Sequence, residues 1–473
     1  MSLNRRHFLA VAGSAAAARS FAGVAGGEIN LGFIAAGGRA NELMGRFADA
    51  GGCRVAAVCD PDTRRLDLAS QRNPDAALYR DVREAVTDDE VDAVVIASCN
   101  HWHCLAAILA MQNGKDVYVE KPLSHSQWEG RQAVAAADKY GRVCQIGTQQ
   151  RSDPMQSQIK AFLHDQGGIG RITGVRVNRF GVRQPIGRRD TPLPIDDAVA
   201  YDLWLGPAAD EPIYRSNLHY DWHWVWNTGS GEMGNWGVHV LDDVRNTVFR
   251  DRVELPSSVA GCGGRIGYDD AGETPNVHLA FFDTGDIPVT IALTNLPGDP
   301  GGRRPPSHPG PDSGYVVYGE DGELHGQRGR AEAFDGGGRS IRKFEGNGSV
   351  RHQANFLEAV RRGDASLLNA PVSVGNDSTG WCNLANLAVR GGGPIDAATL
   401  NEIDDPVWRA AVADMNAHLQ TYDVSIDDDA IVGMPMTNYD ATRHRFVGDG
   451  SDAMNRHLKR DYRDGFEVPT LVG

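Results

Sequence analysis

The chain has few cysteines and no Cys-x-x-Cys pair, which argues against a disulfide framework and against a common zinc or dithiol site. Five of its seven cysteines lie in or beside apolar runs, where a cysteine serves as a small buried hydrophobic residue. These five are Cys53, Cys59, Cys99, Cys104 and Cys144. No metal site is predicted, because His101, His103 and His125 lack a nearby set of carboxylates.

The chain also lacks a long basic run, an internal repeat and any apolar stretch long enough to span a bilayer. Its formal net charge is -15. A nucleic-acid partner is therefore not expected, because phosphates need a surface rich in Lys and Arg. What remains is a globular composition, 41% hydrophobic and 23% charged, over 473 residues, which is enough for two or three domains.

The first residues resemble an export signal. A twin-arginine pattern, NRRHFL at residues 4–9, overlaps an Ala-rich apolar stretch from Phe8 to Ala18, and small residues follow around Ser20 and Ala22. We interpret residues 1–22 as a twin-arginine signal peptide and expect a periplasmic or extracellular protein. Such export moves folded proteins, which suits a protein that takes up its cofactor in the cytoplasm. The alternative is a frayed N-terminal helix with two arginines there by chance.

Residues 29–147 alternate between apolar strands and helical segments. Strands are expected at 29–36, 54–60, 91–98, 115–120 and 142–147, with helices between them. Continuous apolar strands that alternate with helices predict a parallel sheet covered on both faces. We therefore expect a Rossmann domain over residues 28–148, with its ligand beyond the carboxyl ends of the strands.

After residue 147 the pattern changes. Strands are expected at 172–180, 276–283 and 287–294, and a hairpin at 314–326 with Asp321 and Gly322 in the turn. These segments predict a second, α+β domain over residues 149–403, built on a large, mostly antiparallel open sheet. Residues 404–473 are expected to form a C-terminal extension.

The first turn carries a partial dinucleotide fingerprint. Of the three glycines in G-x-G-x-x-G only Gly37 is present, because Ala35 and Ala40 stand at the other two positions. Gly37, Gly38 and Arg39 are predicted to bind the cofactor, since the middle glycine lets the backbone approach a pyrophosphate at a helix N-terminus. Ala35 fits only if its φ is negative. The alternative is a plain glycine-rich turn.

Asp60 ends the second strand and is predicted to accept hydrogen bonds from a ribose 2′-hydroxyl, which favours NAD over NADP. Arg64 and Arg65 lie close enough to weaken that preference. Asp60 also fits as a helix N-cap before Pro61, and both roles are compatible.

Asn100 and His103 follow the third strand, at the sheet edge where a nicotinamide would lie. We predict that His103 faces the cofactor. The alternative is a capping asparagine and a surface histidine.

The strand around Val117–Val119 ends in Glu120, Lys121 and Pro122, so a buried strand finishes on two charges that must be desolvated or held at an edge. A second motif, SGEMGNWGVHVLDDVR, places Asn235 and His239 four residues apart, on one face of a helix.

Together with the first turn, Asp60, Asn100 and His103, these two motifs resemble the Gfo/Idh/MocA oxidoreductases over roughly residues 28–400. The resemblance implies a Rossmann domain followed by an α+β domain, whose open sheet face would form a homodimer or homotetramer. It implies that Lys121 contacts the substrate hydroxyl and the nicotinamide ribose. Glu120 would orient Lys121, and a cis peptide would precede Pro122.

The family pattern has an aspartate where this chain has Asn235. An amide takes no proton, so Asn235 can only position a hydroxyl by hydrogen bonds. Acid and base duty then falls to His239, our first choice because it titrates near neutral pH, or to Lys121, whose pKa burial should lower. The alternatives are a buried core histidine and a simple Glu–Lys ion pair at the sheet edge.

Aromatic residues are dense just before this motif. Tyr220, Trp222, Trp224 and Trp226 fall within seven residues, and such rings suit the apolar faces of sugars, although alternate rings could equally face a core. We predict that one or two of them line the pocket. The predicted substrate-binding residues are Arg151, Trp222 and Trp236.

Three functions are compatible with these features. The first is an exported, NAD-dependent oxidoreductase that transfers a hydride between a secondary hydroxyl of a sugar, glycoside or cyclitol and a tightly held nicotinamide. The second is a redox-type glycoside hydrolase that uses NAD. The third, motivated by Ala35, Ala40 and Asn235, is a non-catalytic sugar-binding protein on a decayed dehydrogenase fold.

Overall fold

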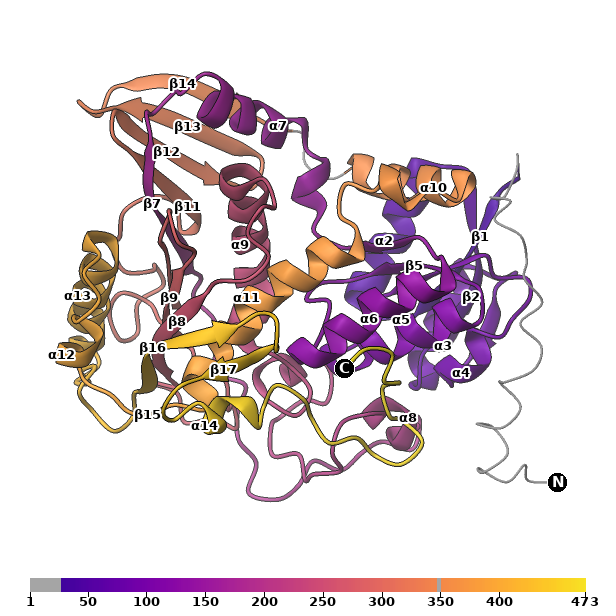
Figure 1. The fold of residues 1–473 in the computed structure, drawn as a ribbon. Coiled ribbons are helices and arrows are strands. Elements are labelled where there is room, and N and C mark those ends of the chain that lie inside the picture. The colour runs from indigo at the N-terminus through magenta and orange to yellow at the C-terminus, as the bar shows by residue number, and fades with distance from the viewer. Residues whose placement is uncertain (1–26, 347–349) are drawn as a thin grey trace.

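The computed structural model of the chain describes residues 27–346 and 350–473, and the predicted signal peptide lies outside these ranges. Two β-sheets dominate the molecule, a parallel sheet with the early strands and a larger sheet with the later ones (Figure 1). No helix in the described ranges is long and apolar enough to cross a membrane.

The first sheet has six parallel strands in the order β3-β2-β1-β4-β5-β6. The parallel pairing of the five expected strands is confirmed, and the short strand at residues 77–79 was not predicted. Its strands are β1 (Ile29–Ile34), β2 (Cys53–Cys59), β3 (Ala77–Tyr79), β4 (Ala93–Ile96), β5 (Asp116–Val119) and β6 (Cys144–Ile146). The intervening helices are α2 (Gly38–Ala50), α3 (Thr63–Arg72), α4 (Val82–Ala85), α5 (His103–Gln112) and α6 (Gln127–Tyr140). The four residues of β4 are fully buried because helices cover both faces of the sheet.

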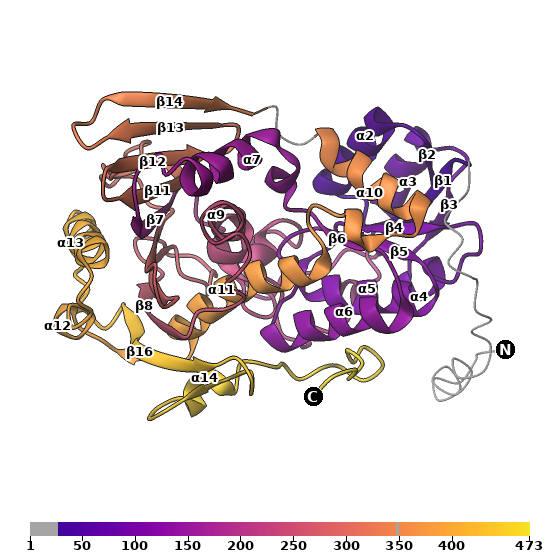
Figure 2. The same ribbon diagram turned by 45° about the horizontal axis from the view of Figure 1, so that its top comes forward.

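A late segment returns to this first domain. The helix α10 (Val350–Arg362) packs beside α2 in both views (Figures 1 and 2). Its Phe356 is fully buried and makes T-shaped ring contacts with Phe47 and Tyr118, with ring centroids 6.1 and 5.8 Å apart. The core of the Rossmann domain therefore includes residues from far along the chain.

The second sheet has eleven strands, in the order β14-β13-β12-β11-β7-β10-β9-β8-β16-β15, with β17 paired to β16. Neighbouring strands are antiparallel except β7 and β10, so the predicted mixed, mostly antiparallel sheet is confirmed. The strands that the sequence predicted are β7 (Ile172–Phe180), β9 (Val277–Asp283), β10 (Val289–Thr294), β11 (Ser313–Gly319) and β12 (Gly322–Gln327). The others are β8 (Ser258–Gly264), β13 (Arg330–Asp335), β14 (Ser340–Glu345), β15 (Gly393–Pro394), β16 (Val432–Asp440) and β17 (Arg445–Val447).

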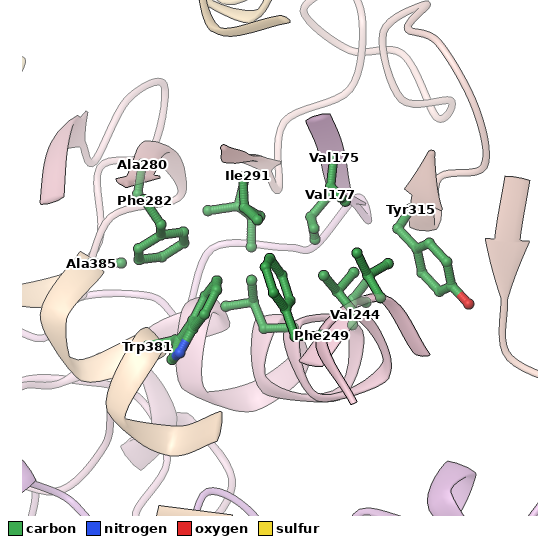
Figure 3. Packing of buried hydrophobic residues seen from close by; sticks show 14 of the residues in the cluster. Val175, Val177, Val244, Phe249, Ala280, Phe282, Ile291, Tyr315, Trp381 and Ala385 are labelled. Carbon is green, nitrogen blue, oxygen red and sulfur yellow. The ribbon is translucent and has the colours of Figure 1, made fainter. Parts of the chain in front are cut away.

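Helices α9 (Val238–Val244) and α11 (Val372–Arg390) cover one face of this sheet. Figure 3 shows the packing there, with Trp381 of α11 against Phe282 of β9 and Phe249, at ring-centroid distances of 5.0 and 5.8 Å. Trp381 is fully buried and its indole N–H donates to the Glu254 carbonyl, so a large apolar side chain carries no unpaired polar atom. On the other face, Trp408 of α13 (Pro406–Gln420) packs on Phe281.

Between β7 and the helical motif at Glu232, residues 181–231 leave the second domain and lie against the first; we call this segment the strap. Its Val199 pairs with Asp62 in an isolated antiparallel bridge at the carboxyl end of β2. His219 meets the same Asp62 carboxylate at 3.0 Å. The strap has a small core of its own around Trp204, and Arg463 of the C-terminal tail donates to its backbone.

Candidate active site

The site lies where the carboxyl edge of the first sheet meets the helix that carries His239. Lys121 follows β5, and the Lys121–Pro122 peptide is cis. The Lys121 ammonium donates to the backbone carbonyl and to the side-chain oxygen of Asn235, at 2.9 and 3.2 Å. Burial lowers the pKa of Lys121 to about 8, because the Glu120 charge offsets only part of the desolvation. A lysine with this pKa can take up or release a proton near neutral pH.

Glu120 does not touch the Lys121 ammonium. It is 3% exposed, and one carboxylate oxygen accepts two hydrogen bonds from Arg39, at 2.7 and 2.9 Å. Its other oxygen accepts a longer bond from the backbone N–H of Lys121, at 3.3 Å. Glu120 thus ties the Lys121 backbone to the first turn of α2, and it orients the lysine through the main chain.

Asn235 and His239 lie close together as predicted, but the backbone between them is not a regular α-helix throughout. Asn235 lies in a π-helical turn, Met233–Gly237, that leads into α9. Such a turn inserts one residue into the helix and is frequent at functional sites. The side-chain amide of Asn235 donates to Glu232 at 3.2 Å while its oxygen accepts from Lys121. Asn235 therefore links a carboxylate to the ammonium without carrying a charge.

His239 is not the better proton acceptor. It is 8% exposed, its ring meets Trp236 at 5.7 Å, and within the described part of the chain its buried Nδ1 has no hydrogen-bond partner. Burial, reinforced by the positive charges of Arg328 and Lys121, holds the pKa of His239 well below its ordinary value. The ring stays neutral at neutral pH, so the preference for His239 over Lys121 is reversed. The unpaired Nδ1 is left to bind a ligand.

Glu232 is a site residue that the sequence did not reveal. Its side chain is fully buried and accepts from Arg179 at 2.7 and 2.8 Å and from Arg183 at 2.8 and 3.0 Å. Burial alone would raise its pKa, but the two guanidiniums outweigh that effect and lower it. The carboxylate stays ionised and holds Asn235 in place.

The turn after β1 holds a strained residue. Ala35 has φ of 84°, so the expectation that its φ is negative is wrong. The next residue explains the shape, because the N–H of Ala36 donates to the Asp60 carboxylate at 2.9 Å. The hydrogen bond from Ala36 to Asp60 holds the turn in this shape, although Ala35 has a Cβ and the glycine that the fingerprint expects there has none.

Replacing Ala35 by glycine is expected to raise the free energy of unfolding by up to about 1 kcal/mol, because the left-handed conformation costs an L-residue about 1–2 kcal/mol and glycine's freedom in the unfolded chain returns part of that. The matched control is Ala36→Gly, at a position outside the left-handed region, which should lose about 0.5–1 kcal/mol. Urea unfolding of both variants measures the difference. Equal losses in the two variants would show that the strain at Ala35 has no cost.

Asp60 organises the backbone at the cofactor edge. It is 2% exposed, accepts from the N–H groups of Ala36 and Asp62, each at 2.9 Å, and has Arg65 at 3.8 Å. Burial raises its pKa. The N-cap of α3 is Asp62, which accepts from the N–H of Arg64, so the alternative role suggested for Asp60 as the cap is wrong.

Gly37 and Gly38 leave the start of α2 clear. The N-cap Gly37 offers no side-chain hydrogen bond to the first turn, and a Cβ at Gly38 would meet nothing within 4 Å. At Gly37 a Cβ would lie 3.0 Å from the Arg65 guanidinium. A helix that begins with uncapped N–H groups beside open space fits the pyrophosphate of a dinucleotide. Among the described residues, no group of His, Cys, Asp and Glu could hold a metal ion.

His103 secures the backbone next to Lys121, and Asn100 contacts the strap. The Asn100 amide donates to Ser230 of the strap at 2.9 Å. The two ring nitrogens of His103 meet the carbonyls of Pro122 and Ser98, at 2.7 and 3.1 Å, and the ring is 1% exposed. The prediction that His103 faces the cofactor is therefore corrected, because its polar atoms are already used by the main chain.

The structure gives Arg151 partners within the protein, in place of the substrate that the sequence predicted for it. Its guanidinium bonds both oxygens of Asp242, at 2.8 and 2.9 Å, and both oxygens of Asp251, each at 2.8 Å. Each of its three nitrogens thus already donates to a carboxylate of the protein. Through Asp242, Arg151 holds α9 in place, so we regard it as a positioning residue.

The predicted aromatic residues divide between packing and the site. Trp222 stacks on His223, with ring centroids 3.6 Å apart, and packs against the strap's small core, so it is not the ring that lines a pocket. A cavity of about 460 Å³ opens beside it, lined by residues of the strap that include Arg183, Tyr220 and Trp224. Trp236 lies between the guanidiniums of Arg179 and Arg328, at 4.5 and 5.3 Å from its ring centre.

Two family models match the chain. One describes an oxidoreductase family with an NAD-binding Rossmann fold and matches residues 29–148; the other describes the C-terminal α/β domain of the same family and matches residues 171–288. Together they span half of the 473 residues. Both carry the name Gfo/Idh/MocA.

Curated relatives match over shorter stretches. Inositol 2-dehydrogenase 2 of Saccharopolyspora erythraea is 38% identical over 121 residues, covering 25% of this chain and 35% of that protein. A glycosyl hydrolase family 109 protein of Shewanella pealeana is 31% identical over 179 residues, covering 31% of this chain and 39% of the relative. The chain thus matches about a third of the length of these relatives.

Solved structures share the fold over about three quarters of this chain. The WlbA dehydrogenase from Bordetella pertussis, in complex with NADH and UDP-GlcNAcA, superposes with a TM-score of 0.55 over 74% of this chain and 93% of that one. The two sequences are 18% identical there, so this likeness establishes the fold alone. With a parallel six-stranded domain, a large mixed sheet and both family models matched in order, the chain belongs to the Gfo/Idh/MocA oxidoreductase family and its first domain is an NAD-binding Rossmann domain.

Proposed function

We propose that the protein is an NAD-dependent oxidoreductase that transfers a hydride between a secondary hydroxyl of a sugar, glycoside or cyclitol and a tightly held nicotinamide. The observation that carries this proposal is Lys121, a half-buried amine with a pKa of about 8 at the carboxyl edge of a dinucleotide-binding sheet. The inositol 2-dehydrogenases among its curated relatives support the substrate class.

The residues present fit the cofactor. The uncapped start of α2 at Gly37 and Gly38 would hold the pyrophosphate, and Asp60 shapes the adenosine end, where its carboxylate would repel a 2′-phosphate and so favours NAD over NADP. When bound, the nicotinamide supplies the hydride acceptor or donor. The chain itself supplies alignment and proton transfer at the hydroxyl that reacts.

In sugar oxidation, neutral Lys121 would accept the hydroxyl proton as the hydride leaves the carbon. Asn235 fixes the lysine through two hydrogen bonds, and Glu232 with its two arginines fixes Asn235. The Nδ1 of neutral His239, which has no partner in the described residues, is available to a second sugar hydroxyl. Reduction runs the same steps backwards, with the ammonium as the proton donor.

The strap supports a cofactor that does not leave between turnovers. It closes over the carboxyl end of β2, next to Asp60, through the Val199 bridge and the His219 contact. The test is to denature purified protein and identify the released dinucleotide by mass spectrometry, then to offer glycosides to native protein and follow nicotinamide absorbance. Protein that releases no dinucleotide, or that binds sugar without one, would refute the proposal and favour a non-catalytic sugar-binding role.

Replacing His219 by alanine is expected to speed release of the bound dinucleotide about fivefold, because the strap loses one hydrogen bond to Asp62, worth about 1 kcal/mol. Burial lowers the pKa of His219, so the contact is made by a neutral ring at neutral pH. The matched control is His308→Ala, because His308 makes a contact of the same length, 3.0 Å, with Asp312 outside the strap. Release is measured by dialysis against excess unlabelled NAD. Equal rates in both variants would mean that the strap does not retain the cofactor.

A redox-type glycoside hydrolase is the second candidate, favoured by the family 109 relative and by a strap that would keep the nicotinamide in place over a cycle of oxidation and re-reduction. The products separate the two functions. A free reducing sugar indicates hydrolysis, and a lasting keto-sugar indicates dehydrogenation.

Export and assembly remain part of the proposal. We expect a periplasmic or extracellular protein, which fractionation of the producing cells would test. We also expect a homodimer or homotetramer formed through the second-domain sheet, which light scattering of the purified protein would test.

A further inference from the structure

The candidate site is positively charged although the chain as a whole carries a net charge of -15. Five cations gather there, which we call the cation cluster: Arg39, Lys121, Arg179, Arg183 and Arg328. Within the described part of the chain, three glutamates form ion pairs with them: Glu42, Glu120 and Glu232. The pyrophosphate of a bound dinucleotide would lie at the start of α2, beside Arg39, and would offset part of this charge, so the argument turns on whether one of the other cations is left without a partner.

Most of the cation cluster is neutralised from within. Arg39 pairs with Glu120 and Glu42, each at 2.7 Å, and Arg179 and Arg183 share Glu232. Arg328 differs, because over residues 27–346 and 350–473 it forms no hydrogen bond and no ion pair. Its one described contact is with the face of Trp236, 5.3 Å from the ring centre. The nearby Asp243 forms no ion pair with Arg328 within the described residues, and burial raises the pKa of that carboxyl well above its ordinary value.

The position of Arg328 is set by a tight hairpin. It stands with Gly329 in a two-residue turn between β12 and β13, and Gly329 takes φ of 78°, which glycine adopts without the steric cost of a Cβ. The side chain is exposed, so its guanidinium is accessible. The hairpin brings it over Trp236, whose ring in turn meets His239. An accessible cation, an aromatic face and a buried ring nitrogen without a partner thus line one side of the site.

We propose that the sugar substrate carries an acidic group, a carboxylate or a sulfate ester, and that Arg328 binds this group while Lys121 faces the reacting hydroxyl. A guanidinium pairs with a planar carboxylate or with a sulfate through two parallel N–H bonds. The Trp236 ring, which lies between Arg179 and Arg328 and meets His239, fixes the position of the Arg328 guanidinium beside the site. This inference rests on the proposed function and adds the chemical class of the substrate.

The test uses a panel of methyl hexuronides and methyl hexoside 6-sulfates, each paired with the neutral methyl hexoside, on protein that holds its cofactor. Binding is measured by calorimetry and turnover by nicotinamide absorbance. Wild-type protein should bind an acidic member of the panel at least about tenfold more tightly than its neutral partner, and Arg328→Gln should lose about 10- to 100-fold for the acidic sugar with little change for the neutral one. The relative affinities for carboxylate and sulfate identify which acid is preferred.

The matched control is Arg330→Gln, because Arg330 is an exposed arginine two residues away on the same hairpin, and it should leave both affinities unchanged. Equal weakening of acidic and neutral sugars by Arg328→Gln, or loss of bound dinucleotide, would overturn the inference by placing Arg328 on the cofactor or in the fold. Reduction of the nicotinamide by neutral sugars with no preference for acids would overturn the inference and leave the proposed function standing. Tight, Arg328-dependent binding of an acidic sugar without any reduction of the nicotinamide would support the inference about the acidic group and refute the proposed oxidoreductase function.

Discussion

Replacing Lys121 by alanine should lower kcat for sugar oxidation by about 10²- to 10⁴-fold while the protein keeps its fold and its cofactor. The expected loss is large because, in the described site, Lys121 is the group whose pKa, about 8, suits proton transfer at neutral pH. The cofactor should stay bound, since the start of α2 and Asp60 lie outside the substitution. Stopped-flow reduction of the bound nicotinamide measures the rate, and the released dinucleotide measures the cofactor content.

The pH dependence gives an independent check. The neutral amine is the base, so oxidation should rise as the pH increases through about 8, and reduction, which needs the ammonium, should fall over the same range. The control is Lys121→Arg, which keeps the positive charge but cannot lose its proton and should be nearly as slow as the alanine variant. An arginine variant with wild-type activity, or a pH profile unchanged by the substitution, would rule out Lys121 as the base.

Replacing Arg151 by alanine should lower the free energy of unfolding by about 3–5 kcal/mol, because it removes the arginine paired with buried Asp242 and the closer of the two arginines paired with Asp251. The control is Arg171→Ala, because Arg171 makes an ion pair of similar length, 2.7 Å, with Glu320 on the surface and should cost no more than about 1 kcal/mol. Chemical unfolding followed by fluorescence measures both variants.

The same variant separates support from substrate binding. If Arg151 only positions α9, kinetics measured well below the unfolding transition should show a change in kcat, through displaced His239 and Asn235, with little change in KM. A large rise in KM with unchanged stability would restore the original prediction that Arg151 binds the substrate.

Much of the first domain follows from its sequence, because its central strands are buried on both faces and some of its helices carry their own capping signals, whereas the short, mostly exposed β3 has neither feature. Ser126 caps α6 by accepting from the N–H of Glu129, and Gly141 ends it in the left-handed region. The strands of the second sheet were harder to find. β16 shares its sheet with β8, nearly two hundred residues earlier, and such long-range pairing has no local signal.

The candidate site also combines residues that the sequence predicts with residues that only the folded structure reveals. Lys121, Asn235 and His239 stand in motifs with recognisable spacing, and the structure brings them together. Glu232 could not be found, because its importance comes from two arginines fifty residues away, one on β7 and one just after it. The sequence also could not show which of Lys121 and His239 is the better base, because their pKa values depend on burial and on several charges from distant parts of the chain.

The return of α10 to the first domain has a practical consequence for protein engineering. Phe356 and Leu357 complete the hydrophobic centre beneath α2, and the C-terminal tail adds Phe466 to the layer under α5. An excised fragment ending near residue 148 would expose that apolar surface to water and should aggregate. No single scission therefore yields two autonomous folding units, and a soluble nucleotide-binding fragment would need residues 350–362 grafted back.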